Sequence, residues 1–360
     1  MIPKEVENVI IGSGWAGLLL GSLFSLKDKS FLILDKEKQS GGNHHVIPTH
    51  SGAIWFRDFL FYEHSELTCE ILEILKRFDQ NVSYEIIPNS ILVFKEGRWD
   101  VFQGFETHQP KFLNEIQYFF SPQKIHINRS LWEIFAGLEE KIRSQIILEV
   151  FVNKMHVESD QSITLQLANK QVIRARHVFF TGNFHQLLGL LPKEIVSTKL
   201  AQQIRQPKLV TGILLSLICS NPNEIGQSNS LYFSSLNIKE EHIPLFGSFT
   251  AISEKAILTQ WLTFLDAKDS DDNELVTHHL KSLKKNVKKF FPNLSSDRVV
   301  EERIELLYDR FGNIQTNHVH QYQLKGINSL WILCPQFNSS GGSLSFLEPV
   351  SVISKTLRLI

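Results

Sequence analysis

The sequence predicts an α/β fold in which a doubly wound unit with a parallel sheet is interrupted by a second, α+β unit with an antiparallel sheet. Two observations predict this arrangement. Apolar runs that end at glycine-rich turns or lead into helical segments occur near the start, in the middle and near the end of the chain. Between them lie short strand-like segments separated by turns, which are typical of antiparallel sheet.

The first of these strand–helix elements carries a dinucleotide-binding motif. The apolar run 9–11 leads into Gly12–Gly17 (GSGWAG), and an apolar helix is predicted over 18–26. In such a motif the first glycine permits a tight turn, the second lets the main chain approach a pyrophosphate, and the third lets the helix pack close to the strand. The start of the helix then presents N–H groups and the positive end of its dipole to the phosphates.

The next strand supplies the residue expected at the ribose. The apolar run 31–34 ends in Asp35, which is followed by Lys36 and then by Gly41-Gly42-Asn43. A carboxylate at the tip of the second strand of this motif accepts hydrogen bonds from a ribose diol. The cofactor is therefore predicted to be a dinucleotide, with FAD and NAD(P) as the two alternatives.

Composition excludes several classes of protein. The chain has 360 residues, enough for two domains, with 42% hydrophobic residues and a net charge of −1. A nearly neutral chain predicts no nucleic-acid partner, and no apolar run reaches the roughly 18 residues that would predict a membrane span. The three cysteines have no metal-binding spacing, and no signal peptide precedes the first strand, so we expect no metal and a cytoplasmic location.

The remaining elements follow from hydrophobic periodicity. Helices are predicted over 67–78, 131–142 and 276–290, and from about Leu344 onward. Strands are predicted within 82–102, over 146–152, near 163–165 and 172–173, over 177–182, within 209–264 and over 329–333.

Four segments together resemble the FAD-dependent oxidoreductases of the amine oxidase, phytoene desaturase, protoporphyrinogen oxidase and UDP-galactopyranose mutase group. They are 9–17 with Asp35, 41–43, 147–155 and 330–344. The Gly-Gly pair marks this flavin group, and the Asn after it is similar to the galactopyranose mutases. The resemblance implies a Rossmann-like FAD-binding domain interrupted by a second α+β substrate domain with an antiparallel sheet. The segments 1–55, 128–205 and 296–360 would form the first domain, and 56–127 and 206–295 the second.

The resemblance also implies a set of cofactor-binding residues. Val152 would lie near the adenine, and main-chain N–H groups at 342–344 would stabilise negative charge on the reduced flavin ring. Pro349 is expected to delay the last helix, and Cys334-Pro335-Gln336 departs from the family pattern. The predicted cofactor-binding residues are Gly12, Gly14, Trp15, Ala16, Gly17, Asp35, Lys36, Gly42, Asn43, Val152, Gly342, Ser343 and Leu344.

The candidate catalytic residues are His44, His45 and Tyr322. Both histidines follow the Gly-Gly loop, and either could act as a general acid or base. Tyr322 precedes the final strand. The sequence contains no serine triad, HExxH or Walker motif, so hydrolysis and phosphoryl transfer are excluded.

The predicted function is that of an amine oxidase-like, FAD-dependent oxidoreductase. It would oxidise or desaturate a small or medium substrate at a C–N or C–C bond by hydride transfer to flavin, with oxygen or another redox partner as electron acceptor. Two alternatives stay open: a flavin isomerase like UDP-galactopyranose mutase, and a flavin-binding protein without turnover.

Overall fold

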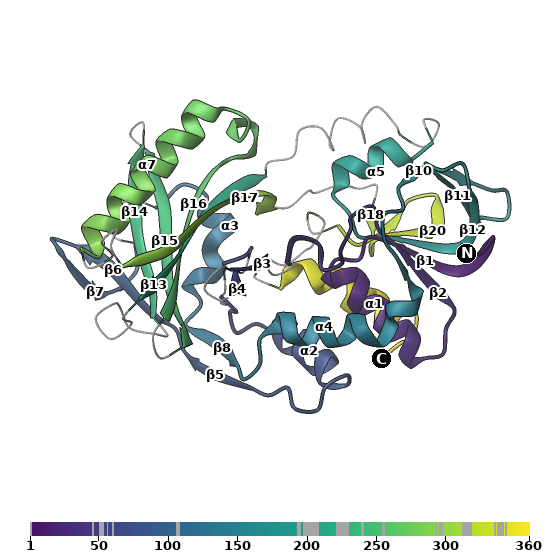
Figure 1. Cartoon of the computed structure of the whole chain (residues 1–360), viewed down its shortest axis with the longest axis horizontal. Coiled ribbons are helices and arrows are strands. Elements are labelled where there is room, and N and C mark those ends of the chain that lie inside the picture. The colour runs from purple at the N-terminus through teal and green to yellow at the C-terminus, as the bar shows by residue number, and fades with distance from the viewer. Residues whose placement is uncertain are drawn as a thin grey trace.

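A computed structural model describes residues 2–44, 47–49, 54–55, 57–59, 61–105, 109–192, 196, 209–220, 230–238, 241–253, 256–292, 294, 298–311, 319–334, 336, 342 and 344–360. Two large sheets lie at opposite ends of the molecule, with segments of the chain crossing between them (Figure 1). We call them the parallel sheet and the antiparallel sheet.

The parallel sheet contains nine strands among the described residues, and its centre has the order β20-β12-β1-β2-β9 with all neighbours parallel. A hairpin of two further strands adds to β12, and a second hairpin extends the edge beyond β20. The strands are β1 (Glu5–Ile11), β2 (Phe31–Leu34), β9 (Ile146–Ile147), β10 (Val152–Val157), β11 (Ile163–Leu167), β12 (Val172–Phe180), β18 (Val319–His320), β19 (Gln323–Leu324) and β20 (Ile327–Ile332).

Helices cover the parallel sheet and bury the centres of its middle strands. All four residues of β2 are buried, as are Val9 and Ile10 of β1, which is typical of strands covered on both faces. Helix α1 packs against α4 and α8, while α5 packs against β10. The helices are α1 (Trp15–Leu26), α2 (Glu66–Lys76), α4 (Leu131–Ile142), α5 (Phe184–Leu190) and α8 (Glu348–Thr356).

The antiparallel sheet contains seven described strands in the order β17-β13-β16-β15-β14-β6-β7, and only the β6–β14 pair is parallel. Helix α7 (Asn273–Phe290) covers its outer face, and α3 (Leu113–Ile116) with the 3₁₀ turn η2 (Gln117–Phe120) packs on the inner face. The strands are β6 (Ser90–Lys95), β7 (Arg98–Val101), β13 (Val210–Ser220), β14 (Ser230–Ile238), β15 (Glu241–Ser253), β16 (Ala256–Asp266) and β17 (Val299–Phe311).

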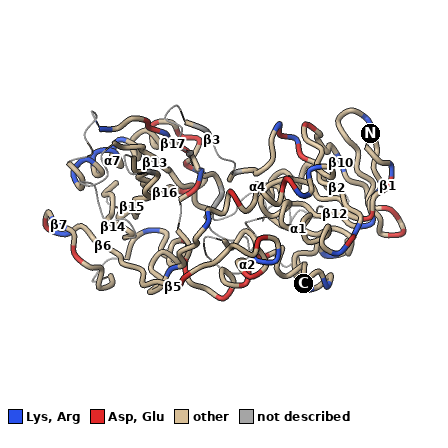
Figure 2. Tube along the Cα trace, turned by 60° about the horizontal axis from the view of Figure 1, so that its bottom comes forward, with Lys and Arg blue, Asp and Glu red and all other residues tan. Residues whose placement is uncertain are grey.

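Helix α7 forms as its sequence predicts. Asp272 caps its start by accepting hydrogen bonds from the N–H groups of Glu274 and Leu275, each 3.0 Å long. Leu283 and Val287 are buried against the sheet, whereas Lys281, Lys285, Lys288 and Lys289 are exposed. Figure 2 shows basic residues along the trace of α7. The basic charge of this helix is therefore displayed at the surface.

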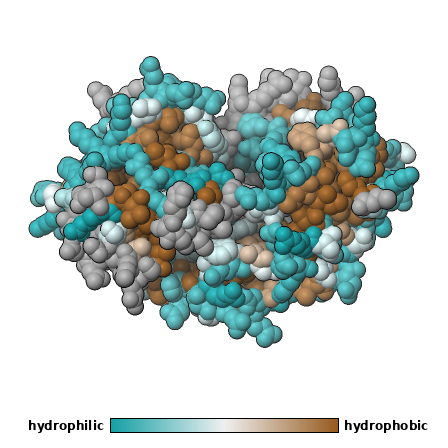
Figure 3. Space-filling model, viewed as in Figure 1, coloured by the Kyte–Doolittle hydropathy of each residue, from teal (hydrophilic) through white to brown (hydrophobic). Residues whose placement is uncertain are grey.

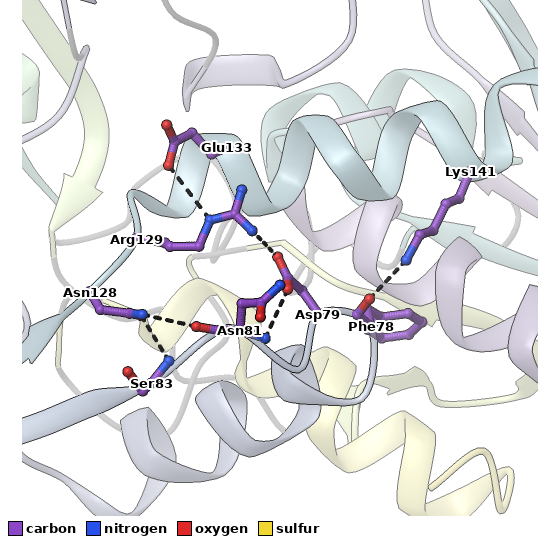
Figure 4. Close-up of polar contacts among 8 residues, drawn as sticks. All are labelled: Phe78, Asp79, Asn81, Ser83, Asn128, Arg129, Glu133 and Lys141. Atoms are coloured by element: carbon purple, nitrogen blue, oxygen red, sulfur yellow. Dashed lines mark hydrogen bonds and ion pairs between the residues drawn. The ribbon is translucent and has the colours of Figure 1, made fainter.

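Two small sheets and a polar junction connect the large sheets. β3 (Ile47–Pro48) pairs with β4 (Ile54–Trp55), and β5 (Tyr84–Pro88) pairs with β8 (Gln123–Ile127). Between α2 and α4, the Asn128 amide accepts from the Ser83 N–H at 2.8 Å and donates to the Asn81 carbonyl at 2.9 Å (Figure 4). Arg129 pairs with Asp79 at the same junction.

Three predicted boundaries differ in the structure. The strand expected over 146–152 is two strands, because Glu149 adopts a positive φ of 59° and turns the chain between β9 and β10. The segment expected to return to the cofactor domain at 296 instead begins with β17, which pairs with β13 of the antiparallel sheet. The last helix begins at Glu348 rather than Leu344, with Pro349 in its first turn, so the delay attributed to Pro349 is confirmed.

Candidate functional site

The geometry of the glycine loop after β1 requires glycine at both of its ends. Gly12 has φ of +110°, and a Cβ there would lie 2.3 Å from the Thr181 hydroxyl oxygen. A Cβ on Gly17 would lie 2.1 Å from the Gly12 carbonyl oxygen, so α1 packs against the loop only with glycine at this position. Ala16, between the loop and the body of α1, is buried.

The second glycine loop lies directly beside the first. Gly41 donates its N–H to the Ser13 carbonyl at 2.9 Å, and Gly14 and Gly41 form a parallel bridge. A Cβ on Gly42 would lie 3.0 Å from Gly14 Cα, whereas a Cβ on Gly14 would meet only Gly42 Cα, at 3.9 Å, among the described atoms. Gly14 is the N-cap of α1 and has no side chain to cover the end of the helix.

Asp35 lies at the carboxyl end of β2 and holds the first loop. Its Oδ2 accepts hydrogen bonds from the N–H and the hydroxyl of Ser13, at 2.5 and 2.7 Å, and its Oδ1 accepts from the Glu37 N–H at 2.9 Å. Its main-chain carbonyl accepts from the Val150 N–H at 2.8 Å, which brings the chain between β9 and β10 beside it. Val152 is buried at the start of β10, and Lys36 is exposed.

An aromatic stack joins four segments around these loops. Trp15 stacks on Phe135 of α4 with centroids 4.3 Å apart, and on His44 with centroids 4.2 Å apart. His44 stacks on Phe346 at 4.7 Å, immediately before α8. Because each ring comes from a different segment, the stack fixes the helix start, the second glycine loop and the C-terminal segment relative to one another.

A carboxylate holds His44 on its other side. Asp58 Oδ2 lies 3.1 Å from His44 Nε2, and Asp58 Oδ1 accepts from the Phe59 N–H at 2.9 Å. Burial, with a smaller contribution from the Asp58 charge, raises the pKa of the Tyr62 phenol, so this hydroxyl stays protonated. The site therefore contains a histidine–aspartate pair with a neutral phenol nearby.

The segment that carries Asp58 lies across the inner face of the antiparallel sheet. The Gln260 side chain of β16 donates to the Asp58 carbonyl at 2.7 Å, and Arg57 Nε pairs with Glu305 of β17 at 3.0 Å. Trp55 packs on Ile218 and Leu258, whereas Phe59 and Phe61 pack on a cluster that includes Leu214 and Leu262. These contacts connect the two sheets through the site.

Polar residues form one row across that inner face. Cross-strand register places Arg303 opposite Ser216, Ser216 opposite Gln260, and Gln260 opposite Ser248. The hydroxyls of Ser216 and Ser248 are buried without a hydrogen-bond partner in the structure. Neither this row nor Asp58 was identified in the sequence, where the polar residues of the row stand singly among apolar neighbours.

The C-terminal glycine loop packs against a buried carboxylate. Gly342 has φ of +143°, and a Cβ there would lie 2.3 Å from Glu63 Oε1. Glu63 is 4% exposed and accepts a 3.0 Å hydrogen bond from the Thr68 hydroxyl. The Ser345 hydroxyl donates to the Gly342 carbonyl at 2.7 Å, and Leu344 is buried in the core.

The structure brings most of the predicted site residues together but leaves three outside its description. His45, Ser343 and the side chain of Asn43 fall outside the described residues. Tyr322 lies in the turn between β18 and β19, where it has φ of +64° and is buried in the core of the parallel sheet. A catalytic role for Tyr322 stays a prediction.

Three other features lie away from this site or are absent from the described chain. A groove of about 560 Å³, lined by residues that include Glu5, Arg174 and His177, lies at the amino ends of the parallel strands. Ligands of doubly wound sheets bind at the opposite, carboxyl ends, so we place the site at the glycine loops.

The described residues contain no cluster of three or more metal-ligating side chains, and none of their helices is long and apolar enough to cross a membrane.

Solved structures with the same arrangement cover nearly the whole chain. An oxidoreductase from Methanosarcina mazei aligns with a TM-score of 0.71 and 13% identity over 98% of this chain and 100% of its own. The chain shares its fold with the amine oxidase-like group. Cyclohexylamine oxidase from Brevibacterium oxydans aligns at 0.69 with 10% identity, over 99% of this chain and 100% of its own. A reduced UDP-galactopyranose mutase aligns at 0.67 with 10% identity, over 99% and 96%.

The sequence comparisons find no such relatives, since no family model and no curated protein matches the chain. The resemblance inferred from the glycine motifs is therefore confirmed through the fold.

Proposed function

We propose that this protein is an FAD-dependent oxidoreductase that oxidises or desaturates a small or medium substrate at a C–N or C–C bond. The observation that carries the proposal is the glycine-lined space at the start of α1, where Gly14 makes no side-chain cap hydrogen bond and a Cβ on it would meet only Gly42 Cα, at 3.9 Å, among the described atoms. Such a space admits the main-chain approach that a pyrophosphate needs. The fold shared with cyclohexylamine oxidase supports the same proposal.

The described residues fit the cofactor. Gly12, Gly14 and Gly42 would leave room for the pyrophosphate, and Asp35 would exchange its bonds with Ser13 for bonds to the ribose. Bound FAD would supply the acceptor for a hydride from the substrate. Because the stack of Trp15, His44 and Phe346 touches every loop of the cradle, it would hold the cradle in place before the cofactor binds.

His44 is the proposed acid–base residue at the substrate. Asp58 orients its ring and stabilises a proton on Nε2, while Trp15 and Phe346 fix the plane of the ring. The Gln260 amide holds the Asp58 main chain, so the antiparallel sheet positions the pair. His45 and Tyr322 are retained as further candidates on the strength of the sequence.

The cofactor is tested by filling the space at Gly14. Purified protein should show the visible absorption of oxidised flavin, or gain it when FAD is added. Gly14→Ala should abolish FAD binding yet leave the fold intact, because its Cβ meets protein only at 3.9 Å and alanine at an N-cap costs about 1 kcal/mol. Gly137→Ala, with open space around its Cβ, is the matched control. Unchanged FAD binding in Gly14→Ala would contradict the proposal.

The reaction is tested by anaerobic mixing with candidate amines. Bleaching of the flavin would identify an oxidase substrate, and His44→Gln should slow bleaching by roughly 10²–10⁴-fold when the two proteins are compared at equal FAD occupancy. Asp58→Asn should slow it less and shift its pH profile. Wild-type rates in His44→Gln would remove His44 from the mechanism.

A flavin isomerase is the second candidate, favoured by the similarity in fold to the reduced UDP-galactopyranose mutase. It would turn over a nucleotide sugar only with reduced flavin and leave the flavin reduced. Bound FAD with neither activity would indicate a flavin-binding protein without turnover.

A further inference from the structure

The buried carboxyl group of Glu63 fills the space that a side chain at position 342 would need. A Cβ on Gly342 would lie 2.3 Å from Glu63 Oε1 and 3.6 Å from Oε2. The carbonyl of Gly342 accepts hydrogen bonds from the N–H and the hydroxyl of Ser345, at 3.3 and 2.7 Å, at the start of the 3₁₀ turn η7 (Ser345–Leu347). A carboxyl group therefore packs directly against the main chain of the C-terminal glycine loop.

Three contacts hold Glu63 against this loop. Its main chain forms an antiparallel bridge with Lys124 of β8. Its Oε1 accepts a 3.0 Å hydrogen bond from the Thr68 hydroxyl and a 3.4 Å hydrogen bond from the Ser65 hydroxyl. Ser65 is the N-cap of α2, so the carboxyl group lies near the positive end of that helix. Hydroxyl donors and a helix start both stabilise negative charge on a carboxylate.

A dinucleotide in the glycine cradle would extend towards this loop. Asp35 ends β2 and Gly14 follows the neighbouring strand β1, so a cofactor with its ribose at Asp35 and its pyrophosphate at Gly14 would lie across the carboxyl ends of these strands. In the same direction, the order of the sheet leads on to β12 and β20. Gly342 lies in the segment after β20, and the stacking of His44 on Phe346 joins that segment to the second glycine loop. The half of FAD beyond the pyrophosphate, which carries the flavin ring, would therefore point towards Gly342.

We propose that Glu63 lowers the reduction potential of the bound flavin by holding a negative charge against the loop that the ring faces. The inference rests on the proposed FAD site. A hydride brings two electrons and one proton from the substrate to the flavin, so the reduced ring gains one negative charge unless it takes up a second proton from water. A nearby carboxylate repels this charge, and does so more strongly in a buried site than in water. Glu63 therefore makes reduction of the flavin less favourable and its reoxidation by the electron acceptor more favourable.

The proposal is tested by the midpoint potential of the flavin in the purified holoprotein. The protein is reduced at equilibrium with a reference dye of known potential, and the absorbances of dye and flavin give the ratio of reduced to oxidised flavin. Glu63→Gln keeps the size of the side chain and an oxygen that accepts from Thr68, but it removes the charge. It should shift the equilibrium towards reduced flavin by about tenfold, which is roughly 30 mV for a two-electron couple. Glu63→Asp keeps the charge but withdraws it from the loop, so it should cause a smaller shift in the same direction.

Glu66→Gln is the matched control, because it removes the same charge from the same helix start on the solvent side. Glu66 is exposed in the first turn of α2, and Figure 3 shows hydrophilic surface at the lower edge of the molecule, in the region of this helix. Water weakens the effect of a charge at such a position. The midpoint potential of this variant should therefore equal that of the wild type.

An unchanged potential in Glu63→Gln overturns the inference, and so does a shift of the same size in Glu66→Gln. A Glu63→Gln protein that binds FAD more weakly but keeps the wild-type potential shows a structural role alone and also overturns it. If Glu63→Gln does not fold, Glu63→Asp carries the test, and an unchanged potential in that variant overturns the inference. A wild-type chain that takes up no added FAD contradicts the proposed function itself.

Discussion

Gly17, at the start of α1 beside the parallel sheet, is constrained by the main chain, whereas Gly247, in the antiparallel sheet, is constrained by a side chain. A Cβ on Gly17 would meet the Gly12 carbonyl, whereas a Cβ on Gly247 would lie 2.2 Å from the Trp261 ring. The first constraint belongs to a short local motif, and the second depends on a partner in the neighbouring strand. At these two glycines, the packing beside the parallel sheet is therefore specified within a short stretch of sequence, and the packing in the antiparallel sheet is specified between neighbouring strands.

The largest effect is expected at Gly17. Gly17→Ala should destabilise the protein by about 3 kcal/mol, since a main-chain carbonyl cannot rotate away, and should also abolish FAD binding. Denaturant unfolding and flavin absorbance measure the two effects. Gly137→Ala, in the exposed face of α4, should instead leave FAD binding unchanged and raise stability by up to about 1 kcal/mol. If Gly17→Ala and Gly137→Ala had the same stability and the same FAD binding, the main-chain constraint at Gly17 would be contradicted.

Gly247→Ala tests the other half. Trp261 is fully buried and packs against Phe291 and Phe249, so its ring has little room to move. We expect a loss of about 2 kcal/mol in the free energy of unfolding, with normal FAD affinity in the folded protein. Loss of FAD affinity in this variant would show that the two sheets are more tightly coupled than the comparison implies.

Acid should weaken the antiparallel half first. Burial, with smaller contributions from His278 and Lys111, lowers the pKa of His279 in α7 to about 4. Between that value and the ordinary one, the unfolded chain binds a proton that the folded chain does not, so stability falls as the pH falls. Lowering the pH from 7 to 5 should cost roughly 1–2 kcal/mol. His279→Gln should lose less over the same range, as measured by thermal unfolding.

A smaller effect is expected at the junction between the halves. Asn128→Ala removes the hydrogen bonds to Ser83 and Asn81, which lie at an exposed position, and should cost about 1 kcal/mol. FAD binding and flavin reduction should not change. A larger loss, or a change in reduction rate, would mean that this junction positions the site.

Lys284→Gln, which breaks a surface pair with Glu302, should cost less than about 1 kcal/mol in the free energy of unfolding.

The two glycine loops could be predicted from the sequence because their packing depends on the main chain. Gly12, Gly17 and Asp35 each have a role fixed by their position relative to one strand and one helix, and the structure places all three as that pattern requires. The break at Glu149 was missed because a positive φ in a non-glycine residue leaves no mark in an apolar run. The site roles themselves stay predictions.

The contacts between the crossing segment and the antiparallel sheet could not be predicted for a different reason. Asp58, Gln260 and Glu305 meet only because a crossing segment and two strands come together in the fold. Each looks like an ordinary polar residue in its own stretch of sequence. No hydrophobic periodicity relates residues so far apart in the chain. The His44–Asp58 pair and the polar row are therefore visible only in the three-dimensional structure.

The order of the strands has a consequence for how the chain folds. Strands β13, β14, β15 and β16 follow one another in the chain, and β15 pairs with both β14 and β16. The parallel sheet instead needs β20 to pair with β12 across the whole intervening sheet, for example Leu330 beside Val178. Because distant pairings are slow to form, strands β13 to β16 should assemble early and the parallel sheet with its glycine loops should close last.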